Sequence, residues 1–234
     1  MWNRADLKAK GKEAFKRNYW KSVVVALILG LIAGGSGGSA GGSSSSATMN
    51  NLQGSEDFVA IMLIVLAAIA MVLVIICLLD IFLFNPLKVG CYSFFLKNSD
   101  ENADLNELSA GFKPNWLNVV ITLFLRNLFL ALWACLFLIP GIIKAYSYRL
   151  VPYILAENPD MKPMEAITLS RNMMNGHKMN TFILDLSFFG WGLLTVCTCG
   201  ILGIFYVNPY YQATDAELYK AIKAGYAQQG NTVA

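Results

Sequence analysis

Charged residues are scarce in this chain of 234 residues. Asp, Glu, Lys and Arg together make up 14% of the sequence, while 56% of it is hydrophobic. An average soluble domain is about one quarter charged. The shortage of charge argues against an ordinary soluble domain and favours a protein that lives in contact with lipid.

Groups that do chemistry are equally scarce. The chain has one histidine, His177, and no Ser–His–Asp set, carboxylate dyad or phosphate-binding glycine loop is recognisable. Its five cysteines are an odd number scattered along the chain, which is not a disulfide framework. The Cys197-Thr198-Cys199 step would suit a metal or a redox role only with further ligands. We therefore expect no enzyme, no metal and no cofactor.

Long apolar runs are what the chain does have. Residues 62–84 contain a single charge, Asp80, and exceed the roughly 20 apolar residues that a helix needs to cross a bilayer. Counting shorter runs as well, we expect helices at about 22–35, 58–84, 117–139, 141–156, 181–197 and 200–218. The Pro140-Gly141 step is expected to be the turn between the third and fourth of these helices.

Positive charge is concentrated at the N-terminus. Seven basic and two acidic residues lie within residues 1–21, whereas residues 36–57 contain no basic residue. The positive-inside rule then places the N-terminus in the cytoplasm and the Gly/Ser-rich segment 34–57 outside. The short apolar run after the basic segment also mimics a signal peptide. We expect it to be retained, because the basic segment is long and amphipathic.

The number of spans depends on the Cys199-Gly200 step. If residues 181–207 form one continuous helix there are five spans, and if residues 198–200 form a turn there are six. Basic residues near the C-terminus and three similar units favour six. Each unit leads to a proline, in the steps Asn85-Pro86, Val151-Pro152 and Asn208-Pro209. Such repetition fits either a transporter with a midplane site or plain duplication of a hairpin.

The predicted fold is therefore an all-α polytopic membrane protein with a single membrane domain over residues 1–234. Six transmembrane helices form three hairpins, and both termini are cytoplasmic. Two amphipathic helices, at about 5–20 and 160–175, are expected to lie on the inner membrane surface. Residues 1–21 would contact anionic lipid headgroups. The candidate lipid-surface residues are Lys8, Lys12, Lys16, Arg17, Trp20 and Lys21.

Ionisable residues inside the spans are the only functional leads, because such groups are expensive in a bilayer. We expect Arg126 or Arg149 to pair with Asp80 or Asp185 and so hold the helices together. The alternative is a polar track for an ion or an anionic headgroup. The candidates are Asp80, Arg126, Lys144, Arg149 and Asp185.

The second half of the chain resembles a known family. The residues that carry the resemblance are Pro140-Gly141-Ile142-Ile143-Lys144-Ala145-Tyr146-Ser147-Tyr148, Val151-Pro152-Tyr153-Ile154-Leu155-Ala156, Gly190-Trp191 and Asn208-Pro209-Tyr210, with Thr214 and Tyr219. With Arg4, Leu7 and Lys8 near the start, this pattern is similar to an uncharacterised bacterial membrane family, domain of unknown function 975, and we expect the resemblance to cover most of the chain except the Gly/Ser-rich segment. The resemblance implies a polytopic protein of the bacterial inner membrane and brings no activity with it.

Together these features predict a non-enzymatic membrane scaffold or accessory protein. Its partners would be anionic lipids, other proteins or a second copy of itself, and we expect no nucleic acid among them. The alternative is a small transporter or channel for an ion or a lipid that uses the buried charges. A water-filled cavity at Arg126 and Arg149 would favour the transporter, and paired charges in a dry interior would favour the scaffold.

Overall fold

The computed structural model describes residues 3–34, 56–112, 115–198 and 200–232, so most of the Gly/Ser-rich segment 34–57 lies outside the described residues. Over these ranges the chain is helical and contains no strand, as predicted. The elements are α1 (Arg4–Arg17), α2 (Tyr19–Gly34), α3 (Glu56–Leu79), η2 (Asp80–Phe84), α4 (Asn85–Asp100), η3 (Leu105–Phe112), α5 (Trp116–Leu136), α6 (Leu138–Ser147), α7 (Val151–Glu157), α8 (Pro163–Met173), α9 (Lys178–Cys197), η4 (Gly203–Val207) and α10 (Asn208–Thr232).

Three helical stretches are long and apolar enough to cross a membrane: Met62–Asp100, Trp116–Leu136 and Lys178–Cys197. Other apolar helices are shorter. Helix α6 has 10 residues and is about 15 Å long, half of a hydrocarbon core of about 30 Å. The structure therefore confirms membrane-type helices, and among the described residues three of them are long enough for a complete span.

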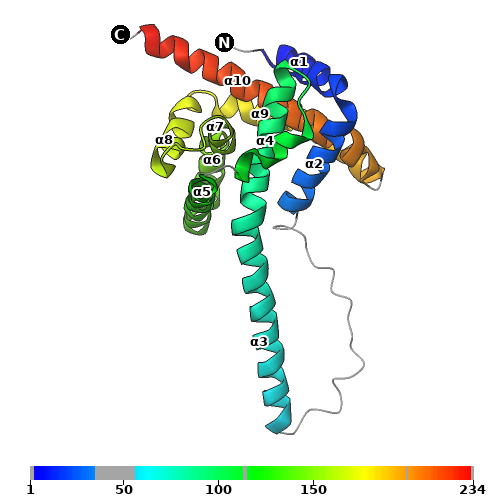
Figure 1. Ribbon diagram of the computed structural model, residues 1–234, viewed down its shortest axis with the longest axis vertical. Helices are drawn as coiled ribbons and strands as arrows, with labels where there is room; N and C mark the ends of the chain where they lie inside the picture. Colours follow the sequence, from blue (N-terminus) through cyan, green and yellow to red (C-terminus); the bar gives the residue numbers. More distant parts are fainter. Residues whose placement is uncertain (1–2, 35–55, 113–114, 199, 233–234) are drawn as a thin grey trace.

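Helix α3 extends away from the rest of the molecule, as Figure 1 shows. Every residue from Met62 to Leu79 is exposed, although all of them are apolar. An exposed apolar surface of this extent is not tolerated in water. Lipid is the natural solvent for such a helix, which explains why a run without polar residues needs no protein neighbour.

The core is built on three helices that each begin at a proline step. Pro86, Pro152 and Pro209 are the second residues of α4, α7 and α10, where a missing backbone N–H costs nothing. The three helices meet through aromatic rings. Tyr92 of α4 packs on Tyr153 of α7 with ring centroids 4.7 Å apart, and Tyr153 stacks on Tyr219 of α10 at 5.2 Å.

A break in the helix precedes each of these prolines. The two π-helical turns η2 and η4 lie directly before α4 and α10, where the N–H of Asn85 donates to the Asp80 carbonyl and that of Asn208 to the Gly203 carbonyl. A proline ring clashes with the carbonyl four residues earlier, and the wider π turn relieves that clash. Before Pro152, the three-residue turn 148–150 separates α6 from α7.

Two turns reverse the chain in its second half. Phe137, with φ −157° and ψ 136°, separates α5 from α6. The turn thus lies three residues before the expected Pro140-Gly141 step. Pro140 is tolerated in the first turn of α6, and a Cβ on Gly141 would lie 3.0 Å from the Ala134 Cα. The single expected helix over 141–156 is in fact divided between α6 and α7.

The second reversal lies at the step that decides the number of spans. Helix α9 ends at Cys197, and Gly200 has a φ of +87°, which glycine adopts without strain. The Gly200 N–H donates to the Thr195 carbonyl at 2.8 Å. A Cβ on Gly203 would lie 2.5 Å from the Thr195 side chain, so the chain folds back on α9. The alternative of one continuous helix over 181–207 is wrong.

The first amphipathic helix packs on protein rather than presenting its apolar face to lipid. Leu7, Gly11 and Phe15 lie on one face of α1 and are buried. Gly11 lies directly against α10, where a Cβ would come within 2.8 Å of the Thr214 Cα. The expectation that this face inserts into the membrane surface is therefore corrected: its partner is α10, which the sequence pattern could not identify.

Helix α8 behaves in the same way. It begins at Pro163, directly after Lys162 and three residues later than the expected start. Its buried residues include Ala166, Ile167 and Ser170, and the Ser170 hydroxyl donates to the Ser147 carbonyl at 2.9 Å. Its apolar side therefore faces the chain itself.

Candidate functional site

Arg149 is the centre of the most polar cluster inside the molecule. It lies in the turn between α6 and α7, and its guanidinium contacts one carboxylate from α9 and one from α10. Nη1 and Nη2 donate to the two oxygens of Asp185 at 2.6 and 3.0 Å. Nε and Nη2 reach Asp215 Oδ1 at 2.9 and 2.7 Å. The contact with Asp185, in which two nitrogens meet two carboxylate oxygens, is of the bidentate kind that makes arginine pairs specific, whereas Asp215 accepts through one oxygen.

Three tyrosines complete the cluster by donating to the carboxylates. The Tyr146 and Tyr211 hydroxyls donate to Asp185 at 2.9 and 3.1 Å, and the Tyr153 hydroxyl donates to Asp215 at 3.1 Å. Arg149 also donates to the Tyr211 oxygen at 2.6 Å. We call Tyr146, Arg149, Tyr153, Asp185, Tyr211 and Asp215 the Arg149 network.

The Arg149 network is shielded and carries one net negative charge. The side chains of Arg149, Asp185 and Asp215 are 14%, 23% and 7% exposed. One arginine against two carboxylates leaves an excess of one negative charge, which the tyrosine hydroxyls help to stabilise. The intact cluster adds little net free energy of folding, but removing one partner leaves a shielded charge without its counter-charge and destabilises the fold strongly. Its clearest effect is to fix α9 and α10 against the α6–α7 turn.

Arg126 has a different role from the one expected. The salt bridges of the described residues do not include it. Its Nε donates to the Tyr148 carbonyl at 3.0 Å, just past the end of α6. A carbonyl there has lost its helical partner, and a cation suits the negative end of a helix. Arg126 therefore stabilises the broken backbone before Arg149.

The remaining predicted charges are satisfied locally. Asp80 pairs with Lys88 on the following helix at 3.3 Å, and the ion pairs found among the described residues do not join it to an arginine. The Lys144 ammonium lies 4.7 Å from the centre of the Trp133 ring, a cation–π contact. Of the expected pairings, only that of Arg149 with Asp185 is confirmed.

Asp215 was missing from the sequence prediction although it lies within the span expected at 200–218. A signal was present in the helical spacing. Tyr211, Asp215 and Tyr219 follow one another at intervals of four and so share one face of α10. An acid between two tyrosines on one face of a helix indicates a polar neighbour across the interface. Nothing in the sequence indicates which neighbour that is.

Two surface recesses adjoin the Arg149 network. One, of about 300 Å³, is lined by Ala145, Tyr146 and Arg149. The other, of about 230 Å³, is an apolar groove between α6 and α9, lined by Ile142, Ile143, Tyr146, Lys178, Met179 and Phe182. Tyr146 borders both recesses, so the network is adjacent to the groove.

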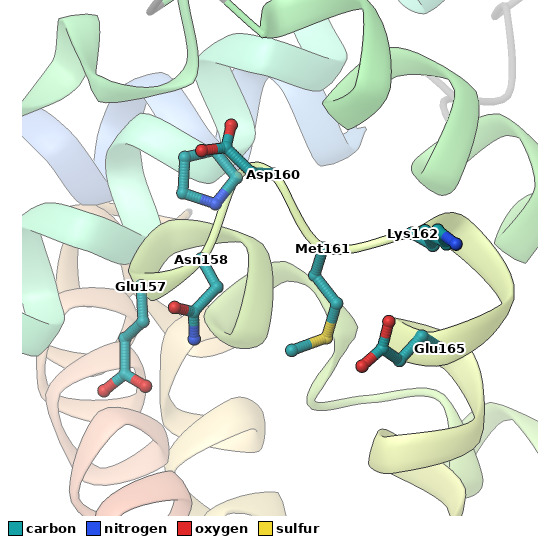
Figure 2. A pocket seen from close by; sticks show the side chains of 7 residues that line it. Glu157, Asn158, Asp160, Met161, Lys162 and Glu165 are labelled. Carbon is teal, nitrogen blue, oxygen red and sulfur yellow. The ribbon is translucent and has the colours of Figure 1, made fainter.

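A third recess, of about 470 Å³, lies at the loop between α7 and α8. Figure 2 shows that its carboxylates from Glu157, Asp160 and Glu165 lie on different sides and do not converge. Glu157 instead accepts from the Tyr219 hydroxyl at 2.8 Å and pairs with Lys223. Burial, then the hydrogen bond to Glu157, raise the pKa of Tyr219, so this tyrosine stays a neutral donor. Among the described residues, no group of three or more His, Cys, Asp and Glu is arranged to hold a metal ion.

The candidate lipid-surface residues divide into two groups. Lys12, Lys16 and Trp20 are exposed. The others also contact protein: Lys8 lies over the Phe188 ring at 4.6 Å, Arg17 donates to the Asp100 carbonyl at 2.8 Å, and Lys21 pairs with Asp104 at 3.2 Å. The hydrogen bond from Lys21 lowers the pKa of Asp104, and burial lowers that of Lys8.

Comparison with known proteins confirms the resemblance in the second half of the chain. A family model described as "Protein of unknown function (DUF975)" matches residues 136–225, a shorter part of the chain than expected. This segment begins at the end of α5 and contains all six members of the Arg149 network. No curated protein and no solved structure matches the chain.

Proposed function

We propose that this chain is a multi-pass protein of the bacterial inner membrane that acts as a non-enzymatic scaffold and presents a basic surface to anionic lipids. The observation that carries the proposal is the pairing of the interior charges. Arg149 is held by two carboxylates, while Lys10, Lys12 and Lys16 are exposed on α1. Charges that are paired with one another serve to hold helices together, and exposed cations are available to headgroups.

The topology that we propose has both termini on the cytoplasmic side. The α5–α6 and α9–η4 hairpins each return the chain to the side from which it came, whether or not they cross the whole bilayer. An even number of crossings keeps the two ends together, and Figure 1 shows both termini at the same end of the molecule. In this arrangement α6, its turn and α7 together form the fourth span, with its break buried in protein, as membrane segments require.

The basic surface consists of Lys10, Lys12 and Lys16, which are exposed on α1. Each basic residue close to an anionic membrane contributes about 1 kcal/mol. We expect phosphatidylglycerol to raise the thermal midpoint of the purified full-length chain more than phosphatidylcholine does. High salt should reduce the difference, because it shortens the range of the charges to well below the 8–10 Å of physiological buffers.

Replacing Lys10, Lys12 and Lys16 with glutamine should remove most of the preference for phosphatidylglycerol. The matched control is Lys162→Gln, which changes a basic residue in the loop before α8. An equal preference in the triple variant and the wild type would contradict the assignment of the lipid-facing surface to α1.

A second candidate, a transporter or channel, is favoured by the recess of about 300 Å³ that reaches Arg149. A flux measurement with proteoliposomes distinguishes the transporter from the scaffold. The scaffold predicts no movement of ions or lipids above that of empty vesicles. Flux that depends on Arg149 would replace the scaffold with the transporter.

A further inference from the structure

The groove between α6 and α9 has the composition of a lipid-binding site. Ile142 and Ile143 form one wall with Tyr146, and Met179 and Phe182 form the other with Lys178. The walls are largely open: Met179 is 68% exposed, and both isoleucines are 49% exposed. The groove is thus an uncovered apolar surface with a defined shape.

The groove has few polar groups, and only one of them is available to bind a ligand. The Tyr146 hydroxyl already donates to Asp185 at 2.9 Å. Lys178 is half-buried, and the salt bridges found among the described residues do not include it. The groove therefore presents apolar walls and one ammonium group without a carboxylate partner.

The position of Lys178 strengthens its preference for an anion. It is the first residue of α9, a helix of 20 residues. The N-terminal end of a helix carries a partial positive charge, which adds to that of the ammonium group. An occupant that suits both features has a negative group at Lys178 and hydrocarbon along Ile142, Ile143 and Phe182.

We propose that this groove binds one anionic phospholipid, with its phosphate at Lys178 and an acyl chain against α6. The inference rests on the proposed membrane setting but concerns a different site from the basic surface of α1. Charge complementarity and the apolar walls identify the occupant. The lipid would pack beside Tyr146 and so brace the Arg149 network from outside.

Native mass spectrometry of the full-length chain tests the proposal. The protein is released from detergent after addition of phosphatidylglycerol or phosphatidylcholine at equal concentration. We expect one phosphatidylglycerol to be retained per chain, and Lys178→Gln to weaken its binding about fivefold, as loss of one cation near an anionic group predicts. Lys178→Arg should retain binding. Lys144→Gln is the matched control, because Lys144 lies on α6, which forms the opposite wall of the groove, but its ammonium group packs over Trp133.

The possible outcomes distinguish lipid binding in the groove from lipid binding at the basic surface of α1. Retention of the lipid by the Lys10, Lys12 and Lys16 triple variant supports the groove even if that surface proves not to bind lipid. Equal retention of the two lipids, or no effect of Lys178→Gln in a variant that elutes as a folded species, would overturn the proposal. So would displacement of the lipid by inorganic phosphate at equal concentration, since no acyl chain would then be held. A thiol introduced by Phe182→Cys reports on what covers the groove. If dimerisation of the chain protects this thiol from labelling and lipid does not, the occupant of the groove is a second copy.

Discussion

At the scale of single residues, the interior of this protein is organised by one arginine and two aspartates. The sequence identified Arg149 and Asp185 because ionisable groups in apolar runs are conspicuous. It did not identify Asp215, because the C-terminal helix becomes polar near that position. It also could not assign partners: Arg126 contacts the Tyr148 carbonyl, a backbone group whose availability depends on a break in α6–α7 that no residue pattern revealed.

The first prediction concerns the balance of charge in the Arg149 network. Arg149→Leu leaves two shielded carboxylates without their cation, and loss of one partner from a buried pair typically costs about 3–5 kcal/mol. Asp185→Asn should cost much less, because Asp215 still pairs with Arg149. Adding Asp185→Asn and Asp215→Asn to Arg149→Leu should recover much of the loss. Thermal unfolding in detergent provides the comparison through a mutant cycle.

Arg126→Leu is the internal control for this cycle. Its cost should add to that of Asp185→Asn, since Arg126 has a carbonyl partner rather than a carboxylate. A strong coupling between Arg126 and Asp185 would show that the two charges interact and that the network is larger than the six residues described above.

At the scale of elements, the sequence predicted most helices but not the way in which they end and meet. The proline steps were recognised as repeats, yet the π turns before Pro86 and Pro209 follow from the clash of a proline ring with a carbonyl, which the chain can relieve in several ways. The face of α1 was correctly read as apolar, but apolarity alone does not distinguish lipid from α10. Gly11 is the residue that explains the choice, because it allows close approach to Thr214.

The second prediction concerns the contact between α4 and η3, where two glycines allow backbones to touch. A Cβ on Gly90 would lie 2.0 Å from the Leu108 carbonyl oxygen, and one on Gly111 would lie 1.8 Å from the Pro86 carbonyl oxygen. Because backbone must move to admit a methyl group, Gly90→Ala should destabilise the fold by about 1–3 kcal/mol or more. Gly111→Ala should do the same.

The matched control is Gly225→Ala on α10, where a Cβ meets nothing within 4 Å. Alanine is the better helix former by up to about 1 kcal/mol, so this variant should unfold at an equal or higher temperature. The Gly90→Ala and Gly111→Ala double variant should cost less than the sum of its parts, because either methyl group separates the same two elements. Full additivity would argue against a shared contact.

At the scale of the whole molecule, the sequence predicted a helical membrane protein with hairpins, and the structure confirms the helices and three stretches long enough to cross a bilayer. The sequence placed the turn after α9 at the Cys199-Gly200 step, but it could not supply where the α5–α6 hairpin turns. Helix α5 ends at Leu136, and the ten residues of α6 are too few to recross a bilayer before the turn at Arg149. The six-span topology therefore depends on α6 and α7 acting as two halves of one span.

The last prediction tests that topology at the tip of the α9 hairpin. Helix α9 has 20 residues, about 30 Å of helix, so a chain that enters from the cytoplasm at Lys178 reaches the outer surface near Thr198. In a variant that lacks the five native cysteines, Thr198→Cys should react with a membrane-impermeant maleimide added to intact cells. Lys12→Cys should react only after the cells are opened. A Thr198→Cys thiol that stays unreactive from both sides would show that the hairpin re-enters without crossing, and a thiol that reacts only from inside would invert the orientation. Both termini remain together in the re-entrant case, because a hairpin that turns within the bilayer contributes no crossing.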